Sequence, residues 1–241
     1  MIYDRLEALI GEAALKKLNG AYVSVIGLGA VGYTVCEALL RSGIVNLKIV
    51  DHDIIKETNF NRQLLALEST LGQKKAAVAK RRLLDINKNA NIEAIDGFFH
   101  VETADEILKN PPDFVVDAID SLNPKFNLIL ELLKRNIRFI SSMGAARKLD
   151  PFKIKYGDIT DATNCPLAKM IRKRLRKKGI TTGVKCVYSE EKPVGVKTPL
   201  IEEEDYYKRG RNRIPIGSIA TVTGIFGNTI AACLIDEILK N

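Results

Sequence analysis

At 241 residues the chain is long enough for one large domain with a buried core. Its formal net charge is +8, from 37 Lys and Arg against 29 Asp and Glu, which favours either an anionic partner such as nucleic acid or a solvated basic surface. The four cysteines form no C-x-x-C pair, which argues against a zinc site or a secreted disulfide framework. The N-terminus has no signal-peptide pattern, so we expect a cytoplasmic protein.

The first predicted element is a helix over residues 4–19, where apolar side chains, Leu9 among them, recur at helical spacing on one face. Arg5 lies near the start of this helix. On the pattern alone, an arginine in this place is a solvated residue at a helix end.

A strand, a glycine turn and a helix are predicted in that order over residues 22–42. The β-branched apolar run at 22–26 leads directly into Gly27, Gly29 and Gly32, and helical spacing follows. In such a turn the first glycine allows a tight reversal, the second lets a phosphate approach the backbone, and the third lets the helix pack on the strand. The backbone N–H groups at the start of the helix then point at the anion.

A second predicted strand, over residues 46–50, ends in Asp51. An acidic side chain at about this distance from a glycine turn accepts hydrogen bonds from ribose hydroxyls. The pattern predicts a nucleotide site of the Rossmann type. Alone it indicates little about activity, because dehydrogenases, flavoproteins and methyltransferases share such turns.

Side chains that suit a triphosphate follow this strand. An N-x-x-R-Q pattern places Asn59, Arg62 and Gln63 next, and Lys75 stands at the start of a basic helix predicted over residues 72–87. Arginine offers a planar fork to phosphate oxygens, and lysine offers a movable point charge. A dinucleotide dehydrogenase has no need of such a set, so the residues favour a triphosphate ligand.

A buried strand predicted over residues 113–120 contains a D-x-x-D pattern made by Asp117 and Asp120. Open α/β sheets bind ligands at the carboxyl ends of their strands, and Mg²⁺ takes one or two carboxylates together with substrate phosphates. We assign the metal to Asp120, whereas Asp117 suits a supporting acceptor or a helix N-cap. A helix over residues 122–135 and a strand over residues 138–142 complete the predicted sheet.

Residues 169–178 form a predicted basic helix with seven positive charges in ten residues. Apolar residues one turn apart let one stripe pack while the charges point outward. Such a density of charge favours contact with an RNA backbone, and a solvated face is the alternative. The candidate RNA-binding residues are Arg172, Lys173, Arg174, Arg176, Lys177 and Lys178.

The last part of the chain divides into a charged and an uncharged segment. Residues 197–213 lack an apolar period and predict a mobile loop, whereas residues 214–235 carry no formal charge. The uncharged segment is long enough to span a bilayer, but its Pro, Gly and polar residues favour a helix buried against the sheet or a dimer partner. We expect Gly224 and Asn228, one turn apart, to let another backbone approach, and we expect no stable membrane insertion.

No cysteine or histidine has a position that supports a catalytic nucleophile or base. Cys36 and Cys233 lie inside apolar helices, where a thiol behaves as a small hydrophobe. Cys165, before a helix, and Cys186, beside a lysine, are better placed for a lowered thiol pKa.

The order and spacing of these patterns resemble the ThiF/MoeB/HesA superfamily of adenylating, ubiquitin-activating-like enzymes. The segments S-S-M-G-A-A-R at 141–147, N-C-P-L-A at 164–168 and V-Y-S-E at 187–190, with the basic helix, resemble the tRNA threonylcarbamoyladenosine dehydratases of TcdA type. The chain departs from that pattern at Ala146-Arg147 and in lacking a Pro near Thr223.

The resemblance implies an α/β, Rossmann-like fold with a mostly parallel central sheet and helices on both faces, plus a basic helical insertion and a C-terminal apolar helix. It implies one ATP-binding adenylating domain over residues 1–241. Within it we assign residues 1–160 to the core, 161–213 to the basic insertion and mobile loop, and 214–241 to the C-terminal helix.

The resemblance also implies a mechanism that uses ATP and Mg²⁺ in a homodimer. Asp120 would hold the metal, while Arg62, Lys75 and the Arg5 supplied by the partner neutralise the triphosphate. The carboxylate of threonylcarbamoyladenosine in tRNA would attack the α-phosphorus to form an acyl-adenylate. The carbamoyl group would then close a ring and expel AMP, without a protein nucleophile.

Two alternatives remain at this stage. One is an adenylyltransferase that activates the C-terminal glycine of a ubiquitin-like sulfur carrier, against which the lack of C-x-x-C pairs and the basic helix weigh. The other is a non-catalytic, nucleotide-sensing RNA-binding module, against which the intact set of charged site residues weighs. The sequence also leaves open a sulfur-relay protein as a further partner.

Overall fold

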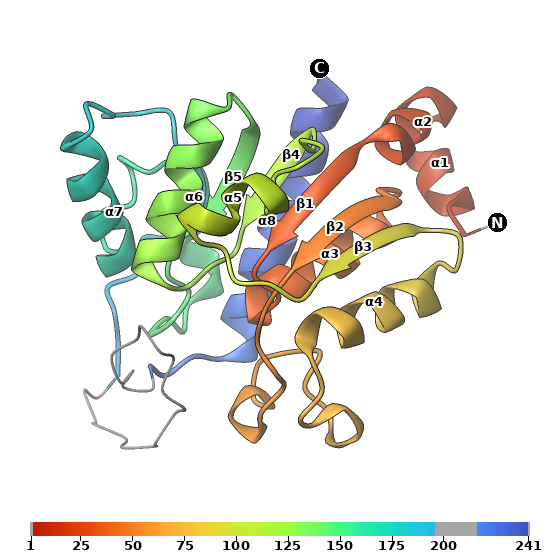
Figure 1. The fold of residues 1–241 in the computed structure, drawn as a ribbon, viewed down its shortest axis with the longest axis horizontal. Helices are drawn as coiled ribbons and strands as arrows, with labels where there is room; N and C mark the ends of the chain where they lie inside the picture. Colours follow the sequence, from red (N-terminus) through yellow and green to blue (C-terminus); the bar gives the residue numbers. More distant parts are fainter. Residues whose placement is uncertain (1, 196–215, 241) are drawn as a thin grey trace.

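A computed structural model describes residues 2–195 and 216–240 of the chain, and its strands form one seven-stranded sheet (Figure 1). The strands are β1 (Tyr22–Ile26), β2 (Asn46–Val50), β3 (Asn91–Ile95), β4 (Phe114–Asp117), β5 (Arg138–Ser142), β6 (Ile154–Asp158) and β7 (Lys185–Ser189). Their order is β3-β2-β1-β4-β5-β7-β6. All pairs are parallel except β6 with β7. The predicted fold class is confirmed.

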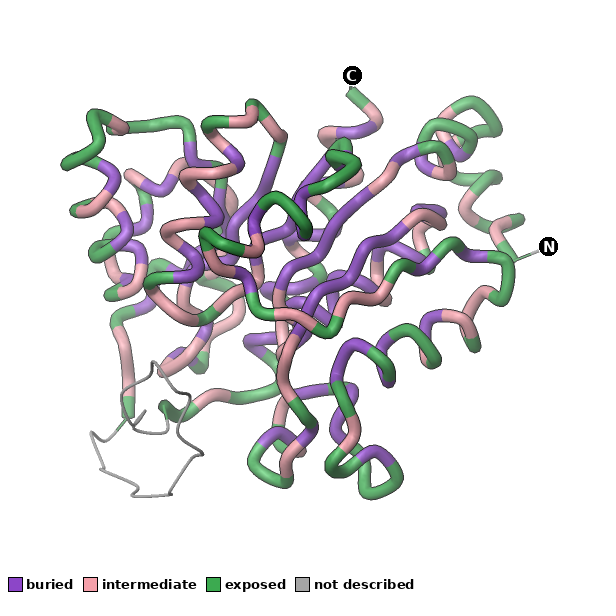
Figure 2. The backbone as a smooth tube through the Cα atoms, viewed as in Figure 1, coloured by how far each residue is buried: buried purple, intermediate pink, exposed green. Residues whose placement is uncertain are grey.

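Helices cover both faces of the sheet. They are α1 (Asp4–Ile10), α2 (Glu12–Gly20), α3 (Ala30–Arg41), α4 (Lys75–Ile86), α5 (Ala104–Ile107), α6 (Leu122–Lys134), α7 (Pro166–Arg176) and α8 (Ala220–Lys240). Apolar residues of α3, α4 and α8 join one core cluster, and those of α5, α6 and α7 join the other. The inner strands β1, β2, β4, β5 and β7 are buried along most of their length, whereas the edge strands β3 and β6 are partly exposed (Figure 2). Helices on both faces explain why parallel strands here are apolar on both sides.

The central strand β1 lies at a topological switch point. It pairs with β2 on one side and with β4 on the other. Ile26, the last residue of β1, is level with Val50 of β2 and with Asp117 of β4. The segments that follow these three strands therefore meet at one edge of the sheet, which is where open α/β sheets bind ligands.

The helix predicted over residues 4–19 is two helices, because Gly11 interrupts it. Gly11 has a φ of 83°, a conformation that favours glycine, and its N–H donates to Glu7 O at the end of α1. Its own carbonyl then accepts from Leu15 N in α2. The break turns α1 away from the line of α2, and Leu9, expected on the packed face, is 81% exposed.

The sheet continues beyond the predicted core boundary at residue 160. β7 lies within the range 161–213 that we assigned to the insertion, yet it pairs with β5 inside the central sheet. β6, for which no strand was predicted, pairs with β7 along its whole length and forms the sheet edge. The insertion therefore contributes a core strand as well as α7.

The apolar C-terminal segment is a core helix, as expected, and within the chain its close contact with α3 is at Gly227. By length and composition α8 is apolar enough to cross a membrane, but its buried face packs on α3 and the sheet. A Cβ on Gly227 would lie 2.6 Å from Thr34 Cβ of α3. Gly224 has no such neighbour among the described residues, and Asn228 is exposed. Approach of another chain's backbone at Gly224 and Asn228 stays a prediction, and the mobile loop predicted at 197–213 lies outside the described residues.

Candidate active site

The glycine turn after β1 is held tightly at two of its three glycines. A Cβ on Gly32 would lie 1.7 Å from the Gly27 carbonyl oxygen, and one on Gly27 would lie 2.8 Å from Ala118 O. Gly27 also has a φ of 96°. At Gly29 a Cβ would meet only Gln63 Nε2, at 4.0 Å, among the described residues. The turn is therefore packed at its ends and open at Gly29, which suits the approach of a phosphate.

Two features at this turn indicate a ligand. In the described part of the chain, no side chain caps the N-terminus of the 12-residue helix α3, whose first N–H groups follow Gly29. The Gln63 side chain is buried beside Gly29, and its Oε1 has no hydrogen-bond partner among the described residues. A buried acceptor left unpaired is unfavourable, and a bound donor would satisfy it. An uncapped helix start binds anions. The site fits a nucleotide phosphate with a hydrogen-bonding group next to it.

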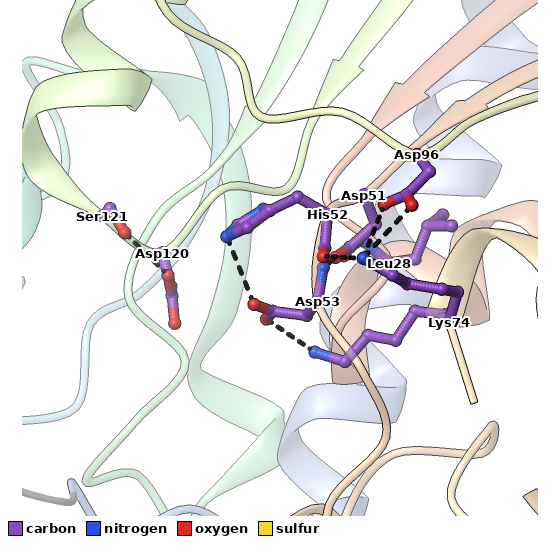
Figure 3. A network of polar contacts seen from close by, with 9 residues as sticks. Leu28, Asp51, His52, Asp53, Lys74, Asp96, Asp120 and Ser121 are labelled. Atoms are coloured by element: carbon purple, nitrogen blue, oxygen red, sulfur yellow. Dashed lines mark hydrogen bonds and ion pairs between the residues drawn. The ribbon is translucent and has the colours of Figure 1, made fainter. Parts of the chain in front are cut away.

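Asp51 links the glycine turn to the segment after β2. Its Oδ2 accepts the Leu28 N–H at 2.6 Å, and its Oδ1 accepts the Asp53 N–H at 2.8 Å (Figure 3). Asp51 is 8% exposed, so these bonds form largely away from water. Each carboxylate oxygen has a second lone pair, so the predicted acceptance of ribose hydroxyls is compatible with this geometry.

Lys75 is held at the site by the carboxylate of Asp53, which was not predicted as a site residue. Its Nζ lies 2.9 Å from Asp53 Oδ2, and the Lys75 side chain is only 6% exposed. The other oxygen of Asp53 lies 3.2 Å from His52 Nε2. The neighbouring Lys74 instead pairs with Asp96 at 3.1 Å and is half exposed (Figure 3). The D-H-D run at the end of β2 was the available signal for this cluster.

The remaining residues of the N-x-x-R-Q pattern shape the loop after β2. Asn59 is buried, and its Oδ1 accepts the Lys56 N–H at 3.1 Å. Arg62 is half-buried and donates from one guanidinium nitrogen to Thr58 O at 2.8 Å and to Asn61 Oδ1 at 2.9 Å. These contacts fix the loop from which Gln63 projects. Contact of Asn59 and Arg62 with a nucleotide stays a prediction.

The two aspartates of the D-x-x-D pattern have different surroundings. Asp117 is fully buried, and its Oδ1 accepts the Ile119 N–H at 3.1 Å. Of its two predicted roles, this contact fits an acceptor that supports the neighbouring backbone and not a helix N-cap. Ser121 stands at the N-cap of α6 instead. Asp120 is exposed after β4, and its Oδ1 accepts from Ser121 Oγ at 3.2 Å (Figure 3).

The chemistry of Asp120 fits a Mg²⁺ ion shared with substrate phosphates, because an exposed carboxylate at the ligand edge is such a donor. Asp51, His52 and Asp53 also bring ligand atoms within 4.8 Å of one another. In that cluster Lys75 already supplies a positive charge to Asp53. We therefore keep the metal at Asp120 as a prediction.

Similarity to known proteins agrees with this geometry. The profile of the ThiF family matches residues 3–241. The chain belongs to the ThiF family. It is 38% identical over 241 residues to the tRNA threonylcarbamoyladenosine dehydratase of Bacillus subtilis, covering 99% of this chain and 95% of that protein.

Within the ThiF family, the chain resembles the dehydratases over more of its length than it resembles a sulfur-carrier adenylyltransferase. The crystal structure of Escherichia coli tRNA N6-threonylcarbamoyladenosine dehydratase in complex with ATP superposes with a TM-score of 0.86 at 30% identity, over 99% of this chain and 93% of that chain. The ThiS adenylyltransferase of Bacillus subtilis is 32% identical over only 57% of this chain and 42% of that protein. Similarity to the dehydratases covers the basic helix and C-terminal helix as well as the nucleotide-binding half.

In this ThiF-family chain Arg5 does not lie with the other site residues. It is exposed on α1, and Figure 1 shows α1 near the start of β1, at the opposite end of the strand from the glycine turn. Arg5 therefore cannot serve the nucleotide site of its own chain without a large movement of α1. A role across a dimer interface stays a prediction.

The basic helix α7 of this ThiF-family chain contains fewer exposed charges than the pattern predicts. One guanidinium nitrogen of Arg172 donates to Ile159 O at 2.8 Å and Ala162 O at 2.6 Å, and Arg174 donates to Asn123 Oδ1 at 2.6 Å. Both arginines are half-buried and hold α7 to its neighbours. The exposed candidates for RNA contact are Lys173, Arg176, Lys177 and Lys178, the last two beyond the end of α7.

Burial disfavours the thiolate at three of the four cysteines. Burial raises the pKa of the Cys36 and Cys186 thiols far above the usual range, and it raises the pKa of Cys233 to about 11. Cys165 is buried, and its Sγ accepts from Gly144 N at 3.3 Å and Ala168 N at 3.4 Å. A chemistry without a protein nucleophile is consistent with these positions.

Proposed function

We propose that this ThiF-family chain is an ATP-dependent tRNA threonylcarbamoyladenosine dehydratase, which adenylates the carboxylate of the modified adenosine and cyclises it with release of AMP. The observation that carries the proposal is the start of α3, which no described side chain caps, beside the Gln63 amide oxygen, which has no hydrogen-bond partner within residues 2–195 and 216–240. It occurs in a chain that resembles such a dehydratase over 99% of its length. A nucleotide would satisfy both groups at once.

The proposed binding of ATP uses the residues around the glycine turn. The phosphates approach the backbone at Gly29, where the turn is open, and the ribose donates to Asp51. Lys75 stands at the start of α4 with its Nζ held by Asp53. That ion pair keeps the ammonium extended, so a phosphate oxygen can take the place of the Asp53 carboxylate with little rearrangement. Arg62 would add a second positive charge by leaving its carbonyl partner.

The proposed reaction has two steps. In the first, a carboxylate oxygen of threonylcarbamoyladenosine bonds to the α-phosphorus of ATP, and pyrophosphate leaves. In the second, the carbamoyl nitrogen bonds to the activated carbonyl carbon, its proton is lost, and AMP leaves with the former carboxylate oxygen. The second step is intramolecular and gains from proximity. The protein binds, orients and neutralises charge, which agrees with its buried thiols.

Mg²⁺ and a second subunit complete the proposed site. A Mg²⁺ ion on Asp120 would neutralise the phosphates and polarise the α-phosphorus. Arg5 would reach the triphosphate of the partner in a homodimer, because its own glycine turn lies at the other end of β1. Both additions increase the positive charge where negative charge develops in the transition state.

The tRNA would contact the exposed charges at the end of α7. Lys173, Arg176, Lys177 and Lys178 lie close together in sequence and point away from the packed stripe of Ile171 and Leu175. Release of counterions from the RNA backbone favours binding to such a surface. We also propose that the enzyme is cytoplasmic. A tRNA substrate and the packing of α8 on α3 and the sheet both agree with this location.

The test of this proposal is AMP release with defined tRNAs. The chain is incubated with ATP and with tRNA that carries threonylcarbamoyladenosine, and with the same tRNA lacking the modification. We expect AMP and pyrophosphate in equal amounts, and cyclised nucleoside, only with the modified tRNA. Equal AMP release with both tRNAs would contradict the proposal. Binding of ATP and tRNA without AMP release would also contradict it and would support the non-catalytic module.

A sulfur-carrier protein serves as the competing substrate in the same experiment. Part of the chain resembles the ThiS adenylyltransferase, and the adenylation chemistry would be the same. AMP release stimulated by a ubiquitin-like sulfur carrier and not by tRNA would favour that alternative. A sulfur-relay protein is a further candidate partner. It would be supported by a second protein that raises the rate of tRNA-dependent AMP release without being adenylated itself.

A further inference from the structure

A buried polar network lies directly beneath the segment that carries Asp120. The Lys125 Nζ is 2.7 Å from Asp117 Oδ2 and donates to Ser141 Oγ at 3.2 Å, and both charged side chains have no exposed surface. The Ser141 hydroxyl in turn donates to the same Asp117 oxygen at 2.6 Å. The second oxygen of Asp117 accepts the Ile119 N–H. Both oxygens of the carboxylate are therefore engaged.

This network joins the parts of the fold that meet at the nucleotide edge. Asp117 ends β4, Ser141 belongs to β5, and Lys125 lies in the first turn of α6. The N–H that binds the other Asp117 oxygen belongs to the segment 118–120 itself. On its opposite side, Ala118 O lies 2.8 Å from the place of a Cβ on Gly27. The segment is therefore held between the carboxylate of Asp117 and the glycine turn.

An ion pair with no exposed surface contributes little net stability. Removing two charges from water is unfavourable, and apolar side chains of similar size often fill such a place equally well. A buried pair is therefore better explained by what it orients. Here it sets the direction of the Ile119 N–H, and so the path of the backbone to Asp120.

We propose that Asp117, Lys125 and Ser141 are positioning residues for the adenylation step, which hold residues 118–120 so that Ala118 closes on the glycine turn and Asp120 faces the phosphates. The inference rests on the proposed function, in which Asp120 binds the metal. None of the three side chains touches the substrate. Their loss acts through Asp120, as loss of outer hydrogen-bond partners does at metal sites.

The test separates positioning from stability. In the double variant Asp117→Leu/Lys125→Met both charges are replaced by apolar side chains, so the melting temperature stays near that of wild type. We expect kcat for tRNA-dependent AMP release to fall about 10-fold to 100-fold, with a smaller change in the KM for ATP. ATP is expected to raise the melting temperature in a Mg²⁺-dependent way. The Mg²⁺ concentration that gives half of the maximal rise should be higher for the double variant than for wild type. A folded double variant with wild-type kcat and Mg²⁺ dependence would overturn the inference.

If the double variant does not fold, a matched pair of serine variants tests the positioning role. Ser141→Ala removes one donor to Asp117, whereas Ser142→Ala changes the next residue, whose Oγ donates to Met143 O. We expect a lower kcat at unchanged melting temperature for Ser141→Ala only. Identical behaviour of the two variants would contradict the positioning role. Wild-type protein without tRNA-dependent AMP release would instead refute the proposed function and leave the Mg²⁺ measurement as the test of the network.

Discussion

Gly32 packs so closely on Gly27 that a Cβ on Gly32 would lie 1.7 Å from the Gly27 carbonyl oxygen. The nearest atoms are those of the Gly27 carbonyl and the Ala118 Cβ, so no flexible side chain can move aside. The start of α3 and the end of β1 are therefore in direct contact through these two glycines. Close contact here sets the distance between the helix N-terminus and the carboxyl edge of the sheet.

Gly32→Ala is expected to lower the free energy of unfolding by about 3 kcal/mol and to abolish ATP binding, because the added methyl group forces β1 and α3 apart. Urea unfolding and calorimetric titration with ATP measure the two effects. Gly29→Ala is the matched control for the fold. Gly29 has a φ of −71° and open space around it, so this variant should keep its stability and lose ATP affinity alone. Wild-type ATP affinity in Gly29→Ala would mean that phosphates do not approach this glycine.

Lys75→Met is expected to lower the rate of adenylate formation about 100-fold, because it removes the buried positive charge that we propose neutralises the triphosphate. Lys74→Met is the control, since the neighbouring Lys74 pairs with Asp96 in a half-exposed position. Its stability should change by about 0.5 kcal/mol or less, and its rate should stay near that of wild type. Single-turnover measurement of AMP and pyrophosphate compares the two. Equal rates in the two variants would remove Lys75 from the site.

Mixing two inactive variants tests whether Arg5 acts across a dimer. Arg5→Ala and Asp120→Ala are each expected to lose activity, the first by removing a charge from the partner's site and the second by removing the proposed metal ligand. In an equal mixture, about a half of randomly formed dimers contain one of each subunit, and each such dimer has one intact site. We expect about a quarter of wild-type activity. Absence of recovery in subunits shown to exchange would contradict the role of Arg5 across the dimer and, given the distance of α1 from its own glycine turn, would leave Arg5 outside the mechanism.

Charge reversal at the end of α7 tests the RNA surface. The double variant Lys173→Glu/Arg176→Glu is expected to weaken tRNA binding and to reduce the slope of log affinity against log salt by about one for each phosphate that the protein no longer binds. Lys16→Glu/Lys88→Glu removes the same charge from exposed positions elsewhere, so its slope should change little. Filter binding at several salt concentrations measures both variants. Similar losses of affinity in the two would indicate a general effect of net charge.

The sequence predicted the nucleotide edge well, because the signals there are local. The glycine turn, the strand ending in Asp51 and the D-x-x-D pattern each follow from short-range spacing. The break at Gly11 was missed because apolar periodicity continues on both sides of a glycine whose positive φ only the fold requires. The edge strand β6 was missed because its sequence has no apolar run.

The contacts that complete the site depend on tertiary packing. Asp53 and Lys75 are 22 positions apart in sequence, and no local rule pairs them. The same holds for Lys125 and Ser141, which meet at Asp117 only because α6 begins above the end of β5. Which glycine of α8 contacts α3 likewise depends on how the helix docks, so Gly227 could not be distinguished from Gly224.

The most direct measurement follows the oxygen atom that the adenylation step transfers. Modified tRNA is prepared with heavy oxygen in both positions of the threonylcarbamoyl carboxylate, incubated with this protein and unlabelled ATP, and the AMP is analysed by mass spectrometry. If the carboxylate attacks the α-phosphorus, each AMP released carries one heavy oxygen atom. AMP without heavy oxygen, formed at the same rate as the cyclised nucleoside, would contradict the acyl-adenylate and with it the proposed activation of the tRNA carboxylate by ATP.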